Sequence, residues 1–392
     1  MVAREAKPNI LILGASGGVA QAVMQILTKY RSVFSFLILL DKNDGILSSK
    51  FIKHKKLDYI FIKKEITSSN IKAVLSGLVD KYKISIVLDL TDCDTKPILS
   101  AADSLKISYL NCSLNDSSAG SMVNFSKDMK VFSKRFRENV HVLSMGMNPG
   151  IANHLIIKGV LEYGLPNDFI EIEYDSGFPE NDPNTPFITW SKKQFLNEAV
   201  WEYTGYCGKD GKYIELEKDA IYTLKKTDIF LKPIKEMEKY PMGMTVSHDE
   251  VITMSRVLEV PGKFIYAIHP VSLKRLKDLS DSGLMIGEEQ ITYLDNVSTP
   301  LSGSDFIGVW LNYDDKRVCY YIDVEHASVQ GTNATLFLVA VGVVAGLLDF
   351  IENKYLEKGV LSVFDLNNKN FLEIVSRHVP IRKYEEGYIK KP

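Results

Sequence analysis

Apolar and polar segments alternate regularly through the first 150 residues of the chain. Short apolar runs typical of buried strands occur at residues 9–13, 36–40, 59–62, 84–90, 108–110 and 140–143. Between them, apolar residues recur at helical spacing, as Val19, Val23 and Ile26 do after the first run. Alternation of this kind predicts a parallel, doubly wound sheet. We therefore expect an α/β fold with a Rossmann-type domain at residues 1–150.

The pattern changes from about residue 151. A helical segment at residues 151–163 is followed by strand segments at residues 169–174, 306–312 and 317–322. Strands joined by a short polar turn, as the last two are, indicate a mixed or antiparallel sheet. We expect a second, α+β domain for substrate binding and dimerisation at residues 151–325. Residues 326–392 then form a helical segment that returns to the first domain.

One apolar run, at residues 336–348, raises the question of a membrane. Its 13 residues would span about 20 Å as a helix, less than the roughly 30 Å of a bilayer core. Asp349 follows directly. We expect a buried helix that is hydrophobic nearly all round, and no membrane contact.

The composition excludes several kinds of partner. A formal net charge of -2 on 392 residues gives no field that would gather nucleic acid or anionic lipid. The four cysteines show no CxxC spacing, which indicates a reducing compartment. The charged N-terminal residues do not form a secretory signal, so we expect a cytoplasmic protein. Zinc-ligand and Walker A spacings are absent from the sequence, and we expect no metal.

The first predicted strand runs into a glycine-rich turn at residues 14–20 and then into a helix. This is the context that a dinucleotide fingerprint requires. Gly14 allows the tight turn, Gly17 lets the backbone approach a pyrophosphate at the helix N-terminus, and Ala20 allows close packing of helix on sheet. The residues of this turn that we expect to bind the cofactor are Gly14, Ser16, Gly17, Gly18 and Val19.

The second predicted strand ends in Asp41. A carboxylate at this place accepts hydrogen bonds from the adenosine ribose and repels a 2′-phosphate. We therefore expect NAD in preference to NADP, although Lys42 beside it weakens that repulsion. The structural alternative is a strand-end aspartate that faces water.

Polar residues follow three further strands, and strand ends carry the ligand contacts in such folds. They are Thr91 and Asp94 after the fourth strand, Asn111 and Asn115 after the fifth, and Asn148 with Pro149 after the sixth. We expect them to line the crevice that receives the nicotinamide. Asp94 and Asn148 have a second interpretation as helix caps, with Pro149 at the first helical position.

Residues 188–198 place an indole and a carboxylate on or beside one short helix. The face of Trp190 would attract an organic cation, and Glu198 would pair with an ammonium group. A structural interpretation fits as well, because Ser191 and Gln194 match a capping box. Trp190 and Phe195 would then form a hydrophobic staple.

Three weaker signals lie in the second domain. Glu171 and Glu173 share one face of a strand, and Glu173 would be costly in a core unless it is paired. Ser247 and Glu250 match another capping box, so we interpret Glu250 as structural. His269 stands alone between a strand and a helix, which is a weak sign of function.

Taken together, these segments resemble bacterial homospermidine synthases of the saccharopine dehydrogenase-like family. The matching segments are residues 14–20, Asp94, residues 146–150 (GMNPG), residues 189–198 with Trp190 and Glu198, residues 247–250 (SHDE), residues 266–270 (YAIHP) and residues 333–335 (NAT). The resemblance covers nearly the whole chain, and residues 190–198 are its most specific part.

The resemblance implies a NAD-dependent enzyme, a homodimer, that joins two putrescine molecules. One amine is oxidised to an imine, ammonia leaves, a second putrescine adds, and the bound NADH reduces the new imine. Trp190 would hold the cationic intermediate and Glu198 an ammonium end. Asn148 and His269 would act at the reacting centre, and the substrate would also contact Asp94, Asn115, Pro149 and Glu173.

The chain departs from this family at Asn115, where the family has a glutamate. Residues 323–326 (DVEH) also resemble the carboxynorspermidine and saccharopine dehydrogenase branch. An imine reductase of that branch is the alternative, and its amino-carboxylate substrate would need an arginine clamp. The arginines of the second domain are Arg256, Arg275 and Arg317, and none lies in a recognisable clamp motif.

Overall fold

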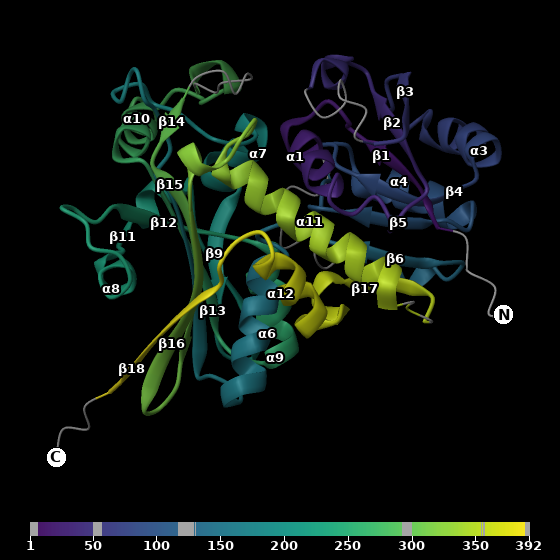
Figure 1. Cartoon of the computed structure of the whole chain (residues 1–392). Coiled ribbons are helices and arrows are strands. Elements are labelled where there is room, and N and C mark those ends of the chain that lie inside the picture. Colours follow the sequence, from purple (N-terminus) through teal and green to yellow (C-terminus); the bar gives the residue numbers. More distant parts are fainter. Residues whose placement is uncertain are drawn as a thin grey trace. The chain divides into compact units, whose positions relative to one another are not determined.

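The computed structural model describes residues 7–49, 57–116, 129, 131–291, 300–353, 355 and 357–388. The chain divides into two compact units (Figure 1). The first unit comprises residues 1–119, 127–151 and 337–375. The second comprises residues 120–126, 152–336 and 376–392.

The first unit contains a seven-stranded sheet in which every described strand pair is parallel. In spatial order its strands are β17 (Gly359–Ser362), β6 (Val140–Leu143), β5 (Ser108–Asn111), β4 (Ile84–Asp89), β1 (Asn9–Leu13), β2 (Phe36–Asp41) and β3 (Tyr59–Lys63). The order β3-β2-β1-β4-β5-β6 is that of dinucleotide-binding folds, in which ligands bind where the order reverses. The predicted Rossmann-like α/β fold is confirmed.

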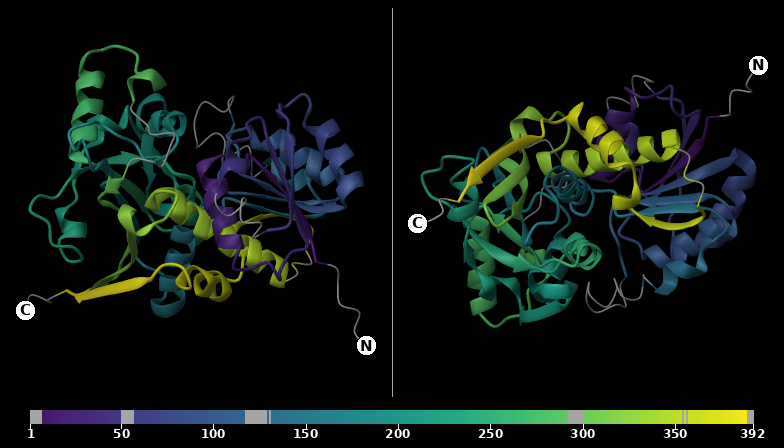
Figure 2. Two further views of the ribbon diagram at one scale, coloured as in Figure 1. Left: turned by 45° about the horizontal axis from the view of Figure 1, so that its top comes forward. Right: turned by 90° about the horizontal axis from the view of Figure 1, so that it is seen from below.

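Helices cover this sheet, as Figures 1 and 2 show. The helices of the first unit are α1 (Gly18–Leu27), α3 (Ile71–Tyr82), α4 (Thr95–Ser104), most of α11 (Ala334–Asn353) and most of α12 (Asn368–Ser376). Residues 10–13 of the central strand β1 have no solvent exposure. This burial explains their unbroken apolar sequence, because a parallel strand covered on both faces has no polar side.

Helix α11 differs in length from the predicted apolar helix. It has 20 residues, so the argument that it is too short to cross a bilayer was wrong, although 78% of its most apolar window is buried inside the structure. Its glycines allow a close approach to the loop after β6. A Cβ on Gly342 would overlap the carbonyl oxygen of Gly146, and one on Gly346 would lie 3.1 Å or less from the side chain of Met145. The helix is a core element, as its apolar pattern predicts.

The second unit contains a nine-stranded mixed sheet. Its main path is β10 (Tyr213–Lys218), β9 (Tyr203–Cys207), β13 (Gly262–Ile268), β7 (Asp168–Asp175), β15 (Ser304–Asn312), β16 (Lys316–Glu325) and β18 (Arg382–Gly387), with β12 (Met242–Val246) on β13 and β11 (Lys225–Lys226) on β12. Strands β7 and β13 pair in parallel, and the other described pairs are antiparallel. The predicted mixed sheet is confirmed.

Shorter elements complete the second unit. They are α6 (Ile151–Tyr163), α7 (Lys192–Leu196), a π-helical turn η3 (Asn197–Trp201), α8 (Asp228–Leu231), α9 (Asp249–Leu258), α10 (Pro270–Asp281), and a small sheet of β8 (Phe178–Pro179) and β14 (Leu301–Ser302). Short 3₁₀ turns in the two units are η1 (Gly45–Ser48), η2 (Ser133–Arg135), η4 (Lys209–Gly211), η5 (Ala220–Thr223), η6 (Glu288–Gln290), η7 (His326–Ser328) and η8 (Val363–Asp365). The C-terminal segment thus holds strands β17 and β18 besides its helices, which the apolar pattern does not indicate.

The central strand β7 has two unlike faces. On one face Ile172 and Tyr174 pack with Phe306 and Trp310 in an apolar core. The opposite face carries the carboxyl groups of β7 residues 171, 173 and 175, all of them buried. Burying three carboxyl groups on one sheet face destabilises the fold unless their charges are neutralised or serve a function.

Candidate active site

The glycine turn of the first unit has the geometry that its sequence predicts. Gly14 has a φ of +74°, and a Cβ there would lie 2.7 Å from the carbonyl oxygen of Leu90. Gly17 is the N-cap of α1, and no side-chain hydrogen bond closes that end of the helix. Backbone N–H groups at a helix N-terminus bind phosphate. The turn therefore fits a dinucleotide pyrophosphate.

Asp41 lies at the end of β2 and anchors this turn. Its two carboxylate oxygens accept hydrogen bonds from the backbone N–H of Ser16, at 2.9 Å, and of Asn43, at 2.8 Å. The hydroxyl of Ser16 donates in turn to the carbonyl oxygen of Asn43, at 2.9 Å. Asp41 thus has a structural role that the sequence does not reveal. Its contact with the ribose stays a prediction.

Hydrogen bonds hold three of the predicted strand-end residues in place. The side-chain amide of Asn115 donates to the carbonyl oxygen of Thr91, at 3.3 Å, and the amide oxygen of Asn111 accepts from the backbone N–H of Ser144, at 2.9 Å. These bonds fix the loops after β4, β5 and β6 at the carboxyl edge of the sheet. Asp94 precedes α4 as its N-cap residue without a side-chain capping bond.

Asp89, which sequence reasoning missed, holds this edge together. It accepts hydrogen bonds from the hydroxyl of Thr91 and the phenol of Tyr109, both at 2.7 Å. Burial raises the pKa of its carboxyl to about 6, although these hydrogen bonds oppose the shift. An aspartate at the end of a buried strand was the available signal.

Asn148 and Pro149 lie in a tight loop between β6 and α6. The backbone N–H of Gly146 donates to the carbonyl oxygen of Pro149, at 2.8 Å, and that of Ile151 donates to Gly146, at 3.1 Å. Helix α6 begins only at Ile151, so Pro149 is not its first residue. The interpretation of this pair as a cap followed by the first helical residue was wrong.

The structure tests the capping interpretation of the segment at residues 188–198. The hydroxyl of Ser191 accepts a hydrogen bond from the backbone N–H of Gln194, at 3.4 Å, and Trp190 contacts Phe195 edge to face at 6.3 Å between ring centroids. The cap and the staple are therefore confirmed. Trp190 is nonetheless only partly buried, and its Nε1 donates to the phenol oxygen of Tyr266, at 2.9 Å. This bond fixes the orientation of the indole.

Glu198 lies on the π-helical turn η3 and faces His248, whose Nε2 is 3.6 Å from Oε1 of Glu198. The other ring nitrogen of His248 contacts Glu250. His248, not Ser247, is the N-cap of α9, and its side chain makes no capping bond. The capping-box interpretation of Glu250 was wrong, because its carboxyl group turns to the imidazole.

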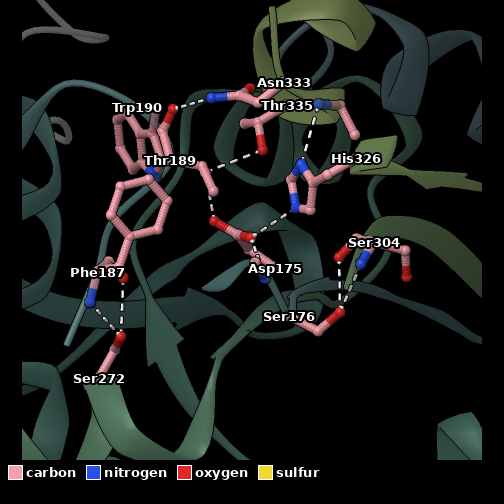
Figure 3. Close-up of polar contacts among 12 residues, drawn as sticks. Asp175, Ser176, Phe187, Thr189, Trp190, Ser272, Ser304, His326, Asn333 and Thr335 are labelled. Carbon is pink, nitrogen blue, oxygen red and sulfur yellow. Dashed lines mark hydrogen bonds and ion pairs between the residues drawn. The ribbon is translucent and has the colours of Figure 1, made fainter. Parts of the chain in front are cut away.

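Asp175 connects four segments of the second unit (Figure 3). It accepts hydrogen bonds from the hydroxyl of Thr189 and the backbone N–H of Gly177, and Nε2 of His326 lies 3.6 Å away. Thr189 also hydrogen-bonds Thr335, at 2.9 Å. The side-chain amide of Asn333 donates to the carbonyl oxygen of Thr189, at 2.6 Å. This network fixes the backbone immediately before Trp190.

In the strand register, Asp305 on β15 lies opposite Asp175 on β7. Tyr266 on β13 lies opposite Glu173 on β7. Burial raises the pKa of the Asp305 carboxyl well above its ordinary value, and the charges of Glu173 and Asp175 raise it further. Burial and the same two carboxylates also keep the Tyr266 phenol protonated far above its usual pKa. We call Glu173, Asp175 and Asp305 the acidic face.

His269 lies at the start of α10, with its ring 5.0 Å from that of Phe178. Burial lowers its pKa, and the charge of Asp175 opposes the shift. The imidazole is thus neutral near pH 7. Among the residues that the structure describes, no group of three or more His, Cys, Asp or Glu side chains could hold a metal ion.

The two units divide the predicted residues between them. The first unit carries Gly14, Ser16, Gly17, Gly18, Val19, Asp41, Thr91, Asp94, Asn111, Asn115, Asn148 and Pro149, and the second carries Glu173, Trp190, Glu198 and His269. Within the second unit, Tyr266 accepts a hydrogen bond from Trp190 and lies opposite Glu173 on the neighbouring strand. The pairing of distant strands places Tyr266, Asp175 and Asp305 near these residues. Sequence spacing does not reveal that pairing.

Comparison with known proteins gives one family match and several similar solved structures. Residues 10–143 match a family model described as the saccharopine dehydrogenase NADP binding domain. No curated protein matches the chain in sequence. The solved structure of a homospermidine synthase from Legionella pneumophila, in complex with NAD, has a TM-score of 0.79 at 13% identity and covers 96% of this chain and 91% of that one.

Two other solved structures are less similar. An oxidoreductase domain protein from Kribbella flavida has a TM-score of 0.41 at 8% identity and covers 95% of both chains. A dehydrogenase from Chromobacterium violaceum has a TM-score of 0.39 at 8% identity and covers 95% of this chain and 93% of that one. The family match and the glycine turn together make the first unit a domain for NAD or NADP, and support an oxidoreductase-type enzyme.

Proposed function

We propose that the protein is a NAD-dependent enzyme that joins two putrescine units into homospermidine. One amine is oxidised to an imine, ammonia leaves as the second diamine adds, and the new imine is reduced within the same cycle. Bound NAD would supply the hydride acceptor and, as NADH, the hydride donor. The reaction needs a second binding feature, which is a site for organic cations.

The observation that carries the proposal is the setting of Trp190. Its indole is oriented by Tyr266, which lies beside Glu173 on the acidic face. A cation near a desolvated indole gains roughly 2 kcal/mol, and buried carboxylates add attraction at short range. A diamine carries two positive charges, one for the indole and one for the acidic face. The match of a fixed aromatic ring with an acidic face favours a diamine over a neutral or anionic substrate.

In this proposal each residue has a distinct role. Glu198 pairs with the far ammonium group of the diamine, while Trp190 holds the cation at the reacting end. His269 is neutral near pH 7 and accepts or donates a proton at the reacting nitrogen. The turn that carries Gly14, with Asp41, Thr91 and Asn111, holds the cofactor.

An imine reductase acting on amino-carboxylates is the second candidate, because the family model comes from saccharopine dehydrogenases. Such a substrate needs an arginine clamp. Arg317 is already engaged, since it contacts Glu386, donates to the carbonyl oxygen of Ile229 at 3.1 Å, and lies 4.4 Å from the Trp310 ring. Arg275 is exposed on α10. The acidic face would also repel a carboxylate, so the diamine is favoured.

The two candidates differ in how they use the cofactor. Protein, NAD and a panel of diamines are incubated, and the products are identified by mass spectrometry. The proposed function predicts a triamine and ammonia without net consumption of NAD. An imine reductase would instead consume reduced cofactor in proportion to product when given an amino acid and an aldehyde. No triamine from any diamine would refute the proposal.

A further inference from the structure

A row of rings on β13 connects Trp190 with His248. Tyr266 accepts the hydrogen bond from Trp190, and its ring stacks on that of Phe264 at 6.0 Å between centroids. Phe264 in turn packs edge to face against the imidazole of His248, at 4.9 Å. Residues 264 and 266 are two apart on one strand, so their side chains lie on the same face. Strand β13 therefore contacts Trp190 through one residue and His248 through the other.

His248 connects this row of rings to Glu198. Nε2 of His248 lies 3.6 Å from Oε1 of Glu198, and the two side chains are 9% and 19% exposed. Glu198 belongs to the π-helical turn η3, in which the backbone N–H of Glu202 donates to the carbonyl oxygen of Asn197, at 3.0 Å. Single π turns are frequent at functional sites. A carboxylate has two acceptor oxygens, so Glu198 can face the imidazole and a second cation together.

The buried groups behind His248 fix its charge. Its Nδ1 contacts Glu250, which is fully buried. Burial alone would lower the pKa of His248, but the charges of Glu250 and Glu198 raise it well above the usual value. Glu171 is also fully buried, and burial and the charge of Glu250 raise its pKa, so Glu171 is neutral. The charge of Glu250 therefore balances the imidazolium, and the negative charge of Glu198 remains for a ligand.

We propose that His248 is a positioning residue, which holds Glu198 where its carboxylate meets the far ammonium group of a diamine. The inference rests on the proposed function, in which Trp190 takes the cation at the reacting end. A freely rotating glutamate side chain would have to be ordered as the ligand binds, and that ordering weakens binding. Pairing with a buried imidazolium orders the side chain beforehand.

Strand β13 supports both receptors of the diamine, because Tyr266 orients Trp190 and Phe264 packs against His248. The spacing between the indole and the carboxylate of Glu198 is therefore set by one strand. A diamine engages both receptors, whereas a monoamine engages the indole alone. Removing His248 should weaken the binding of the diamine and spare the monoamine, while a general loss of folding would weaken both.

Amine binding without turnover tests this role. Protein saturated with NADH, which cannot oxidise an amine, is titrated calorimetrically with putrescine and with butylamine, a monoamine of the same chain length. His248→Gln should reduce the advantage of putrescine over butylamine by roughly fivefold to tenfold, with the affinity for butylamine unchanged. Glu259→Gln, at an exposed residue at the end of α9, should leave both affinities as in the wild type.

A double variant separates positioning from folding. His248→Gln alone leaves the charge of Glu250 buried without its partner, which destabilises the fold. His248→Gln combined with Glu250→Gln removes both charges, and it should lose the same advantage of putrescine. An advantage that survives in both variants would overturn the role of His248. Equal weakening of putrescine and butylamine in both variants would also overturn it.

A titration by NMR distinguishes this inference from the proposed function. The variant His248→Gln identifies the His248 ring signal among the seven histidines. In the ligand-free protein the ring should stay protonated well above pH 6.5, and Glu198→Gln should lower its pKa. A pKa of His248 that Glu198→Gln leaves unchanged would overturn the pairing, whatever the enzyme catalyses. Wild-type protein that shows this titration but binds putrescine no better than butylamine would instead refute the diamine site of the proposed function.

Discussion

The indole nitrogen of Trp190 donates a hydrogen bond of 2.9 Å to the phenol oxygen of Tyr266. Tyr266 is fully buried on β13, and Trp190 is partly exposed just before the N-cap of α7. One bond therefore fixes the orientation of the indole. Sequence reasoning gives the aromatic ring but not the residue that orients it.

We predict that Tyr266→Phe weakens diamine use more than it weakens the fold. The substitution keeps the ring and removes the acceptor for Trp190, a bond worth about 1 kcal/mol. The KM for the diamine should rise several-fold with NAD affinity unchanged, as steady-state kinetics and cofactor titration would measure. Tyr222→Phe, at a residue that is 55% exposed, is the matched control. An unchanged KM for the diamine would mean that Trp190 does not need the hydrogen bond to Tyr266.

Glu198→Gln should slow diamine turnover by roughly a hundredfold, as loss of a charge-assisted contact of about 3 kcal/mol implies. The shape of the side chain is kept, and the cap at Ser191 is untouched. NAD affinity should stay near wild type in a fluorescence titration. Wild-type turnover in this variant would leave residues 188–198 as a capped helix and nothing more.

Cofactor choice depends on Asp41 in our account. Wild-type protein should bind NAD more tightly than NADP, and Asp41→Ala should narrow that preference by removing the charge that repels a 2′-phosphate. Because Asp41 also accepts bonds from Ser16 and Asn43, the variant should bind both cofactors more weakly. Calorimetric titration with each cofactor measures the ratio. A wild-type preference for NADP would contradict the assignment.

Two glycine substitutions should have opposite effects on the stability of the first unit, because only one of them lies where α11 closely approaches the loop after β6. A Cβ at Gly342 would meet the backbone of Gly146, whereas one at Gly77 in α3 has nothing within 4 Å. Gly342→Ala should destabilise the first unit by about 1–3 kcal/mol, as overpacking does, and Gly77→Ala should stabilise it by roughly 0.5–1 kcal/mol. Circular dichroism in urea is the measurement, since Trp190, Trp201 and Trp310 all lie in the second unit. Equal midpoints would contradict the packing.

The parts of the fold that could be predicted are those set by local burial. Residues 10–13 are apolar throughout because β1 is covered on both faces, and the glycine turn after them has the backbone angle that Gly14 permits. The length of α11 could not be read from its apolar core, because its terminal turns carry polar residues such as Thr335 and Asp349. Strand β18 is largely charged and pairs at a sheet edge, where an apolar face is not required.

The candidate site was predictable only where one segment carries the chemistry. Trp190 and Glu198 are eight residues apart, so one motif reveals both. Asp305 lies 130 residues from Asp175 and meets it through strand register, which no local pattern encodes. At Glu250 a local sequence pattern is present, but it predicts the wrong contact. Its spacing from Ser247 matches a cap, yet the contact with His248 and the buried carboxyl of Glu171 determine its position.

Isotope retention tests the central claim most directly. Putrescine carrying deuterium on both amine-bearing carbons is incubated with protein and NAD in the presence of excess unlabelled NADH, and the product is weighed by mass spectrometry. Our account predicts a triamine that retains all of the deuterium, because the hydride leaves and returns within one bound cycle. A product that has exchanged deuterium with the free NADH pool, or no triamine at all, would contradict it.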